Sequence, residues 1–478
     1  MAFNGIREFI NALEKTGDVV HVKKEVDWDL EAGAISRRNY EMGGPALLFE
    51  KVKDYPEGYR LFNGSLGTFR RVAISLGLSP DADVREIYRV FEEREQSPVK
   101  PIIIYGKKAE CKENIVLGDD VDLNEFPAPM IHDGDQGRYF GTWDVVVSHD
   151  PEKNWTNWGM YRFMIHNEKM LTGYPTPHSH LGMILMNQFV PKNKPMPIAI
   201  VIGTDPLCNM VATAGYGIGR NEVDYAGALR QKPVELVKCE TSDLLVPAHS
   251  EIVIEGEILP NRTALEGPFG EYPGYRTEGA KAGTLCKVNA ITFRSNPILT
   301  MIALGVPVDD ASLAAAITAG ISMKRRLLLH GLPITDVYVP PEGVTHMIVV
   351  GVRQGGIDMV RKIGEVLTAR RAWANKIVVV NDDVDVFDMG QVIHAMASKW
   401  HPGRGTIIQT LASPKANTLT PGYSMEERRN AKGAAAFIDC TWPLDWPEEH
   451  IPVKSSFKEI YPKEIQEKVT ASWGTYGL

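Results

Sequence analysis

The pattern of apolar residues changes along the chain, and this change limits the fold more than any single motif does. From about residue 111 to 305, short runs that alternate apolar and polar residues are separated by Gly, Pro and Asn clusters. Such alternation is typical of half-buried strands. Many short strands joined by turns predict a β-barrel or sandwich-like domain. The expected strands cover 144–148, 197–202, 251–258, 284–292 and 297–304.

The sections before and after this region have a helical period. In residues 5–16 four apolar residues recur at helical spacing, and Gly17 is a typical stop. A second helix is expected over 84–93, and a long helix over 311–329.

The section beyond the long helix alternates strands and helices. Two fully apolar runs, 347–352 and 376–382, flank a helical stretch at 357–371. Buried strands joined by a helix are typical of βαβ units, so a parallel or mixed sheet is expected here.

The length of 478 residues is too great for one hydrophobic core, so several domains are expected. The predicted class is a multidomain α+β or α/β fold. Its predicted parts are an N-terminal α/β segment (1–110), the β-rich domain (111–310), a linker helix (311–330), a C-terminal α/β domain (331–441) and a tail (442–478).

Composition and charge argue against several classes of protein. A net charge of −8 argues against nucleic acid as the main partner. No apolar run reaches the roughly 20 residues of a membrane helix, and the N-terminus lacks the features of a signal peptide. A cytoplasmic protein is therefore expected. The cysteines are scattered and form no CxxC pair, which predicts free thiols, mostly buried, at Cys111, Cys208, Cys239, Cys286 and Cys440.

The segment 156–162 (TNWGMYR) carries three residues suited to ligand binding. Gly159 permits a ligand to approach the backbone closely. Arg162 offers a planar fork for a carboxylate or phosphate, and the amide oxygen of Asn157 is a ligand for a hard cation. The alternative is a surface loop with an ordinary ion pair.

Two further segments contain candidate metal ligands. His178 and His180 lie two residues apart, so they would share one face of a strand. The alternative is one exposed and one hydrogen-bonded histidine. Glu222 and Asp224 supply oxygen ligands, which suit Mn²⁺ or Mg²⁺ better than zinc. The alternative is a helix whose first turn is acidic.

The segment 266–271 (EGPFGE) holds two carboxylates, Glu266 and Glu271, around a Gly–Pro turn. Two acids held close together do not both ionise freely, so one would keep its proton and act as a general acid beside an arginine. The alternative is a tight turn with two solvated glutamates.

Other glycine-rich and basic segments carry less information. The glycine-rich stretch 215–219 lacks the dinucleotide-binding pattern and is expected to be a mobile or tightly turning loop. No phosphate-binding loop and no nucleophile elbow occurs. The basic cluster 324–326 is expected to be the solvated face of a helix.

In order and spacing, TNWGMYR, the histidine of TPHSH, NEVDYAG and EGPFGE resemble the UbiD family of prenylated-FMN-dependent (de)carboxylases. The resemblance extends from REFINALEK near the N-terminus to the region near Asp439. It implies a split β-barrel domain that binds the flavin, and a C-terminal α/β domain that forms homodimers or homohexamers.

The resemblance also implies site residues. Asn157, His180 and Glu222 would bind a divalent metal, usually Mn²⁺, that holds the flavin phosphate, and His178 would lie outside the site. Arg162, Glu266 and Glu271 would form the catalytic network. The implied cofactor-binding residues are Asn157, Trp158, Gly159, Met160, Tyr161, Arg162, Ser179, His180, Glu222 and Lys376.

A K⁺ site is also implied. It would use backbone atoms near Ala212 and Thr213, with Arg404 close by. Tyr272 and residues around 305–320 and 420–425 would line the substrate pocket.

The implied reaction is the reversible, non-oxidative decarboxylation of an aromatic, heteroaromatic or α,β-unsaturated carboxylic acid through a covalent prenylated-FMN adduct. Arg162 would attract the substrate carboxylate and orient Glu271, and Glu271 would donate a proton after CO₂ leaves. A separate flavin prenyltransferase would supply the cofactor. Two alternatives stay open. One is an FMN oxidoreductase on a split barrel, which needs neither the two glutamates nor the metal set; the other is a non-catalytic subunit of a larger carboxylase.

Overall fold

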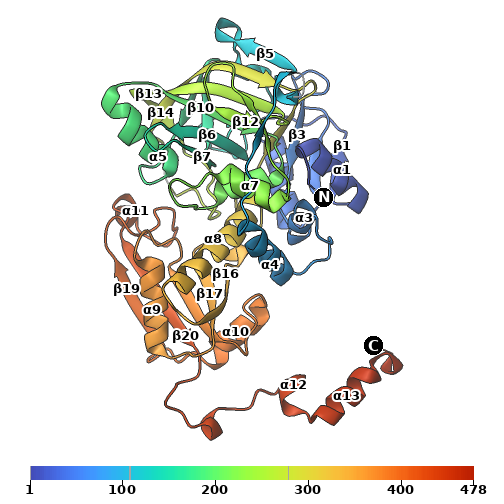
Figure 1. Cartoon of the computed structure of the whole chain (residues 1–478), viewed down its shortest axis with the longest axis vertical. Coiled ribbons are helices and arrows are strands. Elements are labelled where there is room, and N and C mark those ends of the chain that lie inside the picture. Colours follow the sequence, from blue (N-terminus) through green and yellow to red (C-terminus); the bar gives the residue numbers. More distant parts are fainter. Residues whose placement is uncertain (1, 107–108, 278, 478) are drawn as a thin grey trace.

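The computed structural model describes residues 2–106, 109–277 and 279–477. The N-terminal and central sections form one body and the C-terminal section forms a second, with helix α8 (Asp310–Leu329) between them (Figure 1). None of the helices within the described residues is long and apolar enough to cross a membrane.

A four-stranded sheet organises the N-terminal section, in the order β1-β2-β3-β15. The predicted first helix is confirmed as α1 (Ile6–Thr16), which buries Ile6, Phe9, Ile10 and Leu13 and ends at Gly17 with φ 74°. The other elements of this section are β1 (Val19–Val22), α2 (Glu31–Glu41), β2 (Ala46–Phe49), β3 (Arg60–Asn63), α3 (Phe69–Ser75), α4 (Val84–Glu95) and β15 (Ile298–Met301).

The fourth strand of this sheet comes from far along the chain. The run 297–304 was expected among the strands of the central domain, but β15 pairs in parallel with β3. A short apolar run predicts burial, and burial alone does not say which sheet receives the strand.

The central section is built on an eight-stranded sheet in the order β7-β6-β10-β13-β14-β9-β8, with β5 also paired to β14. No pairing joins the end strands β7 and β8 within the described residues, so the split barrel stays a prediction. The strands are β5 (Asn114–Leu117), β6 (Asp144–Asp150), β7 (Trp155–Gly159), β8 (Phe163–Asn167), β9 (Met170–Gly173), β10 (Met196–Ile202), β13 (Ile252–Glu266) and β14 (Lys281–Phe293).

Shorter elements accompany this sheet. Helices α6 and α7 pack against β7, and a separate three-stranded sheet has the order β12-β11-β4. The elements are β4 (Ile102–Ile103), α5 (His180–Ile184), α6 (Pro206–Thr213), α7 (Glu222–Arg230), β11 (Glu235–Lys238) and β12 (Leu245–Pro247). All five cysteines are free and buried, as predicted.

The C-terminal section has a five-stranded sheet in the order β16-β17-β18-β20-β19. The βαβ prediction is confirmed, since β17 and β18 are parallel and α9 connects them. The predicted helix 357–371 ends earlier, at Thr368. The elements are β16 (Ile334–Tyr338), β17 (Met347–Val352), α9 (Ile357–Thr368), β18 (Lys376–Asn381), α10 (Met389–Ser398), β19 (Thr406–Leu411), α11 (Met425–Arg429) and β20 (Gly433–Cys440).

The basic cluster on α8 does not form a solvated face, so that prediction is wrong. Lys324 pairs with Glu92 at 2.9 Å and with Asp336 at 3.1 Å, and Arg325 pairs with Glu95. Helix α4 carries both glutamates, so these salt bridges join α4 to α8.

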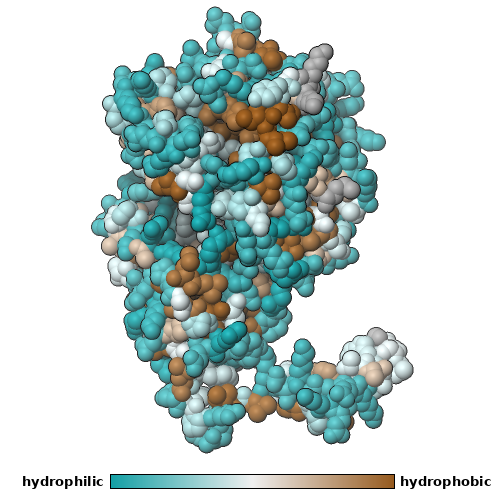
Figure 2. Space-filling view, in the orientation of Figure 1, coloured by the Kyte–Doolittle hydropathy of each residue, from teal (hydrophilic) through white to brown (hydrophobic). Residues whose placement is uncertain are grey.

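The tail leaves the C-terminal body as short helices, among them α12 (Phe457–Ile460) and α13 (Lys463–Ala471). It extends away from the rest of the molecule in Figure 1, and Figure 2 shows hydrophobic residues on its surface. Its exposed apolar side chains include Leu444, Val453, Phe457, Ile460, Tyr461, Ile465, Trp473 and Tyr476.

Candidate active site

The predicted metal ligands come from three elements that meet at one edge of the central sheet. Asn157 lies on β7, His180 begins α5 and Glu222 begins α7. The backbone N–H of Trp158 donates to Glu222 Oε2 at 2.9 Å, and that of Thr156 donates to Asn221 Oδ1 at 3.1 Å. Strand β7 is therefore fastened to the first turn of α7.

The three side chains converge. Asn157 Oδ1 lies 3.0 Å from His180 Nδ1, which lies 3.9 Å from Glu222 Oε1. Glu222 is 1% exposed, and its Oε1 has no hydrogen-bond partner. Burial raises the pKa of the Glu222 carboxyl to about 8 and lowers the pKa of His180.

This donor set fits a hard divalent cation, because an orphaned buried carboxylate oxygen needs a positive partner. No group of three or more His, Cys, Asp and Glu side chains suited to a metal occurs within the described residues. The amide of Asn157 is the third donor here. Of the other candidates, His178 is exposed and Asp224 pairs with Lys100 at 2.6 Å.

The predicted catalytic residues form a second cluster. Arg162 follows β7, Glu266 ends β13, and Glu271 lies in the turn that leads to β14. The guanidinium holds Glu266 with two bonds, from Nε to Oε1 at 2.7 Å and from Nη2 to Oε2 at 3.0 Å. Its Nη1 donates to Glu271 Oε1.

The cluster has the electrostatics of a tightly held ion pair. Burial alone would lower the pKa of Arg162, but the charge of Glu271 and the hydrogen bonds and charge of Glu266 outweigh it, so the pKa rises above its ordinary value. Because one cation faces two carboxylates, a proton on one of them reduces the repulsion. The alternative of two solvated glutamates is wrong for Glu266, which is fully buried.

Sequence reasoning missed the groups that support this cluster. The hydroxyl of Tyr139 donates to Glu266 Oε1 at 3.1 Å, and its ring lies 4.5 Å from that of Phe269. The Arg162 guanidinium lies 5.2 Å from the same Phe269 ring. Asp135 Oδ1 accepts from the backbone N–H of Gly270 at 2.9 Å. No local motif marks Tyr139, which lies 127 positions before Glu266.

Comparisons with known proteins decide the family. Residues 10–91 match the N-terminal domain of 3-octaprenyl-4-hydroxybenzoate carboxy-lyase, residues 103–307 its Rift-related domain and residues 313–440 its C-terminal domain. The chain belongs to the UbiD family. The predicted resemblance is confirmed.

Relatives of this UbiD chain include named decarboxylases. The pyrrole-2-carboxylic acid decarboxylase of Pseudomonas aeruginosa is 31% identical, over 99% of this chain and 98% of its own length. The vanillic acid decarboxylase of Sedimentibacter hydroxybenzoicus in closed form matches with a TM-score of 0.86 and 28% identity, covering 98% of this chain and 99% of that one.

A third relative was solved with a flavin. An evolved dimeric form of the UbiD-class enzyme HmfF from Pelotomaculum thermopropionicum, in complex with prFMN, has a TM-score of 0.79 and 27% identity. It covers 94% of this chain and 97% of its own.

The predicted flavin-binding stretch of the UbiD chain lies between the two clusters. Trp158 is buried and Met160 half-buried. The hydroxyl of Tyr161 accepts from the backbone N–H of Leu181 at 3.1 Å, and Ser179 caps α5 by accepting from Gly182 at 3.1 Å.

The need for glycine at position 159 comes from a neighbour in the same stretch of chain. A Cβ at Gly159 would lie 2.4 Å from the ring of Tyr161. The sequence suggested close approach of a ligand, but the neighbouring tyrosine already requires glycine at this position.

The remaining predicted residues lie in different places. Ala212 and Thr213 end α6. Lys376 is exposed at the amino end of β18, in the other body. Arg404 stacks on Trp446 at 5.4 Å, near the carboxyl end of β18, where Asn381 accepts from the Trp442 N–H. Arg404 therefore does not lie beside Ala212 and Thr213, and that expectation is wrong.

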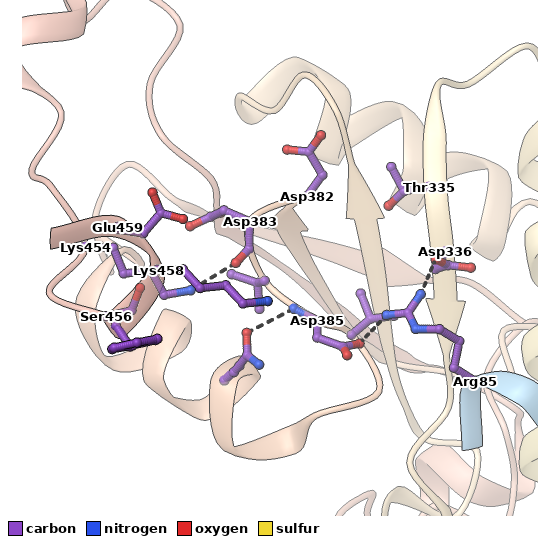
Figure 3. A pocket seen from close by; sticks show the side chains of 14 residues that line it. Arg85, Thr335, Asp336, Asp382, Asp383, Asp385, Lys454, Ser456, Lys458 and Glu459 are labelled. Carbon is purple, nitrogen blue, oxygen red and sulfur yellow. Dashed lines mark hydrogen bonds and ion pairs between the residues drawn. The ribbon is translucent and has the colours of Figure 1, made fainter. Parts of the chain in front are cut away.

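A large cavity lies elsewhere. A hollow of about 700 Å³ separates the tail from the C-terminal sheet, with Asp336, Asp383, Asp385 and Lys454 among its lining residues (Figure 3). Three of its carboxylates have basic partners: Arg85 pairs with Asp336 at 3.3 Å and with Asp385 at 2.7 Å, and Lys399 pairs with Asp383 at 2.7 Å. None of the predicted site residues is among the described residues that line this cavity.

Replacing Tyr139 with Phe is expected to lower kcat about ten- to a hundredfold and to leave metal content unchanged. The loss of one hydrogen bond to a charged partner, about 1.5–3 kcal/mol, would loosen Glu266 and hence Arg162. Steady-state kinetics and metal analysis check this, with Tyr105→Phe as the control because Tyr105 is 78% exposed. An unchanged kcat would remove Tyr139 from the site.

Proposed function

We propose that this chain is a prenylated-FMN-dependent decarboxylase that acts reversibly on an aromatic, heteroaromatic or α,β-unsaturated carboxylic acid. The observation that carries the proposal is the bidentate Arg162–Glu266 pair with Glu271 on the same guanidinium. This cluster and the Asn157–His180–Glu222 set lie at opposite ends of one short segment of chain.

The residues suited to the cofactor agree with this proposal. Asn157, His180 and Glu222 would hold Mn²⁺ beside the flavin phosphate, with the backbone of 158–161, Ser179 and Lys376 as further contacts. A K⁺ site near Ala212 and Thr213 belongs to the same proposal. When bound, prenylated FMN supplies an electrophilic centre and an electron sink for breaking the carbon–carbon bond.

The chain's own residues supply charge and the proton. Arg162 attracts and orients the substrate carboxylate. Glu266 balances the charge of Arg162, so that Glu271 can hold a proton on its carboxyl group. Glu271 delivers that proton to the carbon that has lost CO₂, so the substrate carbon gains hydrogen where the carboxylate stood.

The domain plan completes the proposal. The flavin domain is a split barrel over 111–310, and residues 311–330 link it to an oligomerisation domain over 331–441. The exposed apolar side chains of the tail support a homodimer or homohexamer, since an uncovered apolar surface of this kind favours association. A relative has been solved in a dimeric form.

A panel of acids tests this function. The protein is made with and without a flavin prenyltransferase, and CO₂ release is measured from pyrrole-2-carboxylate, vanillate and a cinnamic-type acid. We expect release from at least one acid, and only from protein made with the prenyltransferase. Turnover with plain FMN and a reductant, but no CO₂, would instead favour the FMN oxidoreductase. A folded protein that binds neither flavin nor metal would favour the non-catalytic subunit.

A further inference from the structure

The turn that carries Glu271 contacts the C-terminal body through its next residue. The hydroxyl of Tyr272 accepts from Asn417 Nδ2 at 3.0 Å, and the same nitrogen lies 3.1 Å from His346 Nε2. The rings of Tyr272 and His346 are 6.2 Å apart. Tyr272 belongs to the loop between β13 and β14, whereas the other two residues belong to the C-terminal section.

The hydrogen-bond donors and acceptors of this contact match. Asn417 Oδ1 accepts from the backbone N–H of Leu419 at 3.0 Å, which fixes the amide so that its two N–H groups face Tyr272 and His346. Burial, and then the charge of Lys376, lower the pKa of His346 to about 4. The ring is therefore neutral at pH 7, and Nε2 accepts a hydrogen bond.

The C-terminal side of the contact is firmly held. The backbone N–H of His346 donates to Gly343 O at 2.7 Å, and its carbonyl accepts from the N–H groups of Asn375 and Lys376, each at 3.0 Å. Two β-branched residues precede it in the left-handed region, Val344 with φ 43° and Thr345 with φ 61°. Such residues adopt this region only where the surroundings enforce it.

The other side of the turn is attached to the central domain. Asp135 Oδ1 accepts from the Gly270 N–H at 2.9 Å, and Arg162 donates to Glu271. Glu271 thus lies between an anchor on the central domain, one residue before it, and an anchor on the C-terminal body, one residue after it.

We propose that Tyr272, Asn417 and His346 form an interdomain latch, a set of positioning residues that fixes the turn 267–274 and with it the carboxyl group of Glu271. The latch joins this turn to the C-terminal body, and it couples the relative placement of the two bodies to the placement of the proton donor. This inference rests on the proposed function, in which Glu271 is that donor.

The test compares Tyr272→Phe, Asn417→Ala and the double variant in the full chain made with a flavin prenyltransferase. Tyr275→Phe is the matched control, since Tyr275 lies in the same loop and is 63% exposed. Hydrogen–deuterium exchange is followed by mass spectrometry in peptides covering 266–276, 341–347 and 413–420. Steady-state kinetics with the best acid of the panel accompany it.

Tyr272→Phe keeps the ring and removes only the hydroxyl. We expect its backbone amides in 266–276 and 413–420 to exchange about three- to tenfold faster than in wild type, as the loss of about one hydrogen bond predicts. We also expect kcat of Tyr272→Phe to fall by about three- to tenfold, with KM within about twofold of the wild-type value. The double variant should have a kcat no lower than that of the more impaired single variant, because the residues act as one unit.

Exchange and kcat equal to wild type in Tyr272→Phe would overturn the latch, since ring packing alone would then explain the contact. The exchange measurement does not depend on catalysis. A wild-type protein that releases CO₂ from no acid would refute the proposed function, and the exchange data would still decide whether the two bodies are latched.

Discussion

Glu271→Gln is expected to reduce decarboxylation by about 10²- to 10⁴-fold, the range attributed to a positioned proton donor. The amide has nearly the same shape and still presents an oxygen to the Nη1 of Arg162, which Glu271 Oε1 contacts in the structure. It has no proton to deliver at neutral pH. Because the proton is needed only after CO₂ has left, the reaction should stop between the loss of CO₂ and the formation of the protonated product.

The measurement is single-turnover CO₂ and product release, with the mass of bound flavin and the metal content recorded on the same sample. Flavin and metal should remain at wild-type levels, because Glu271 belongs to neither predicted ligand set. Glu257→Gln is the control, since Glu257 lies on β13 nine positions before Glu266. A Glu271→Gln protein that retains a third or more of wild-type turnover would show that another group donates the proton.

Glu222→Gln is expected to weaken Mn²⁺ binding by about 100-fold or more and to lose most of the bound flavin. Glu222 is the one carboxylate of the proposed ligand set, and its buried Oε1 has no hydrogen-bond partner. A glutamine has the same volume but carries no negative charge to balance that of the cation. Changes to residues that only orient a metal ligand already weaken metal affinity by about 10–100-fold, so the loss of a charged ligand should cost at least as much. Bound flavin should fall together with the metal, because the metal would hold its phosphate.

Metal titration and metal analysis of the purified protein check this prediction. Asp224→Asn is the matched control, because it changes a carboxylate two positions away that pairs with Lys100 instead. Thermal unfolding should show that both variants are folded. Loss of metal in Asp224→Asn but not in Glu222→Gln would overturn the ligand assignment.

The spacing of apolar residues along the sequence predicted those helices and strands whose formation depends on residues close together in the chain. Helix α1 follows from the spacing of its four buried residues and from Gly17, and the parallel strands β17 and β18 follow from two apolar runs with a helix between them. The partner of β15 was missed, because burial of a strand does not specify its neighbour.

The sequence also did not predict the ion pairs of α8 or the hydrogen bond of Tyr139, because their partners lie far away along the chain. Lys324 meets Glu92 across 232 positions and Tyr139 meets Glu266 across 127, and no local pattern records such contacts. The motifs predicted Glu266 and Glu271 as a pair, and the resemblance implied that they form one network with Arg162. The fold brings both carboxylates onto the Arg162 guanidinium because β13 ends at Glu266, where the turn carrying Glu271 begins.

One measurement tests the central claim most directly. The chain is produced with a flavin prenyltransferase, and its visible spectrum, the mass of its bound flavin and its metal content are recorded together with CO₂ release. We expect prenylated FMN with about one Mn²⁺ per chain, and CO₂ released from an unsaturated or aromatic acid. Unmodified FMN bound equally well without the prenyltransferase, and no CO₂ from any acid, would contradict it.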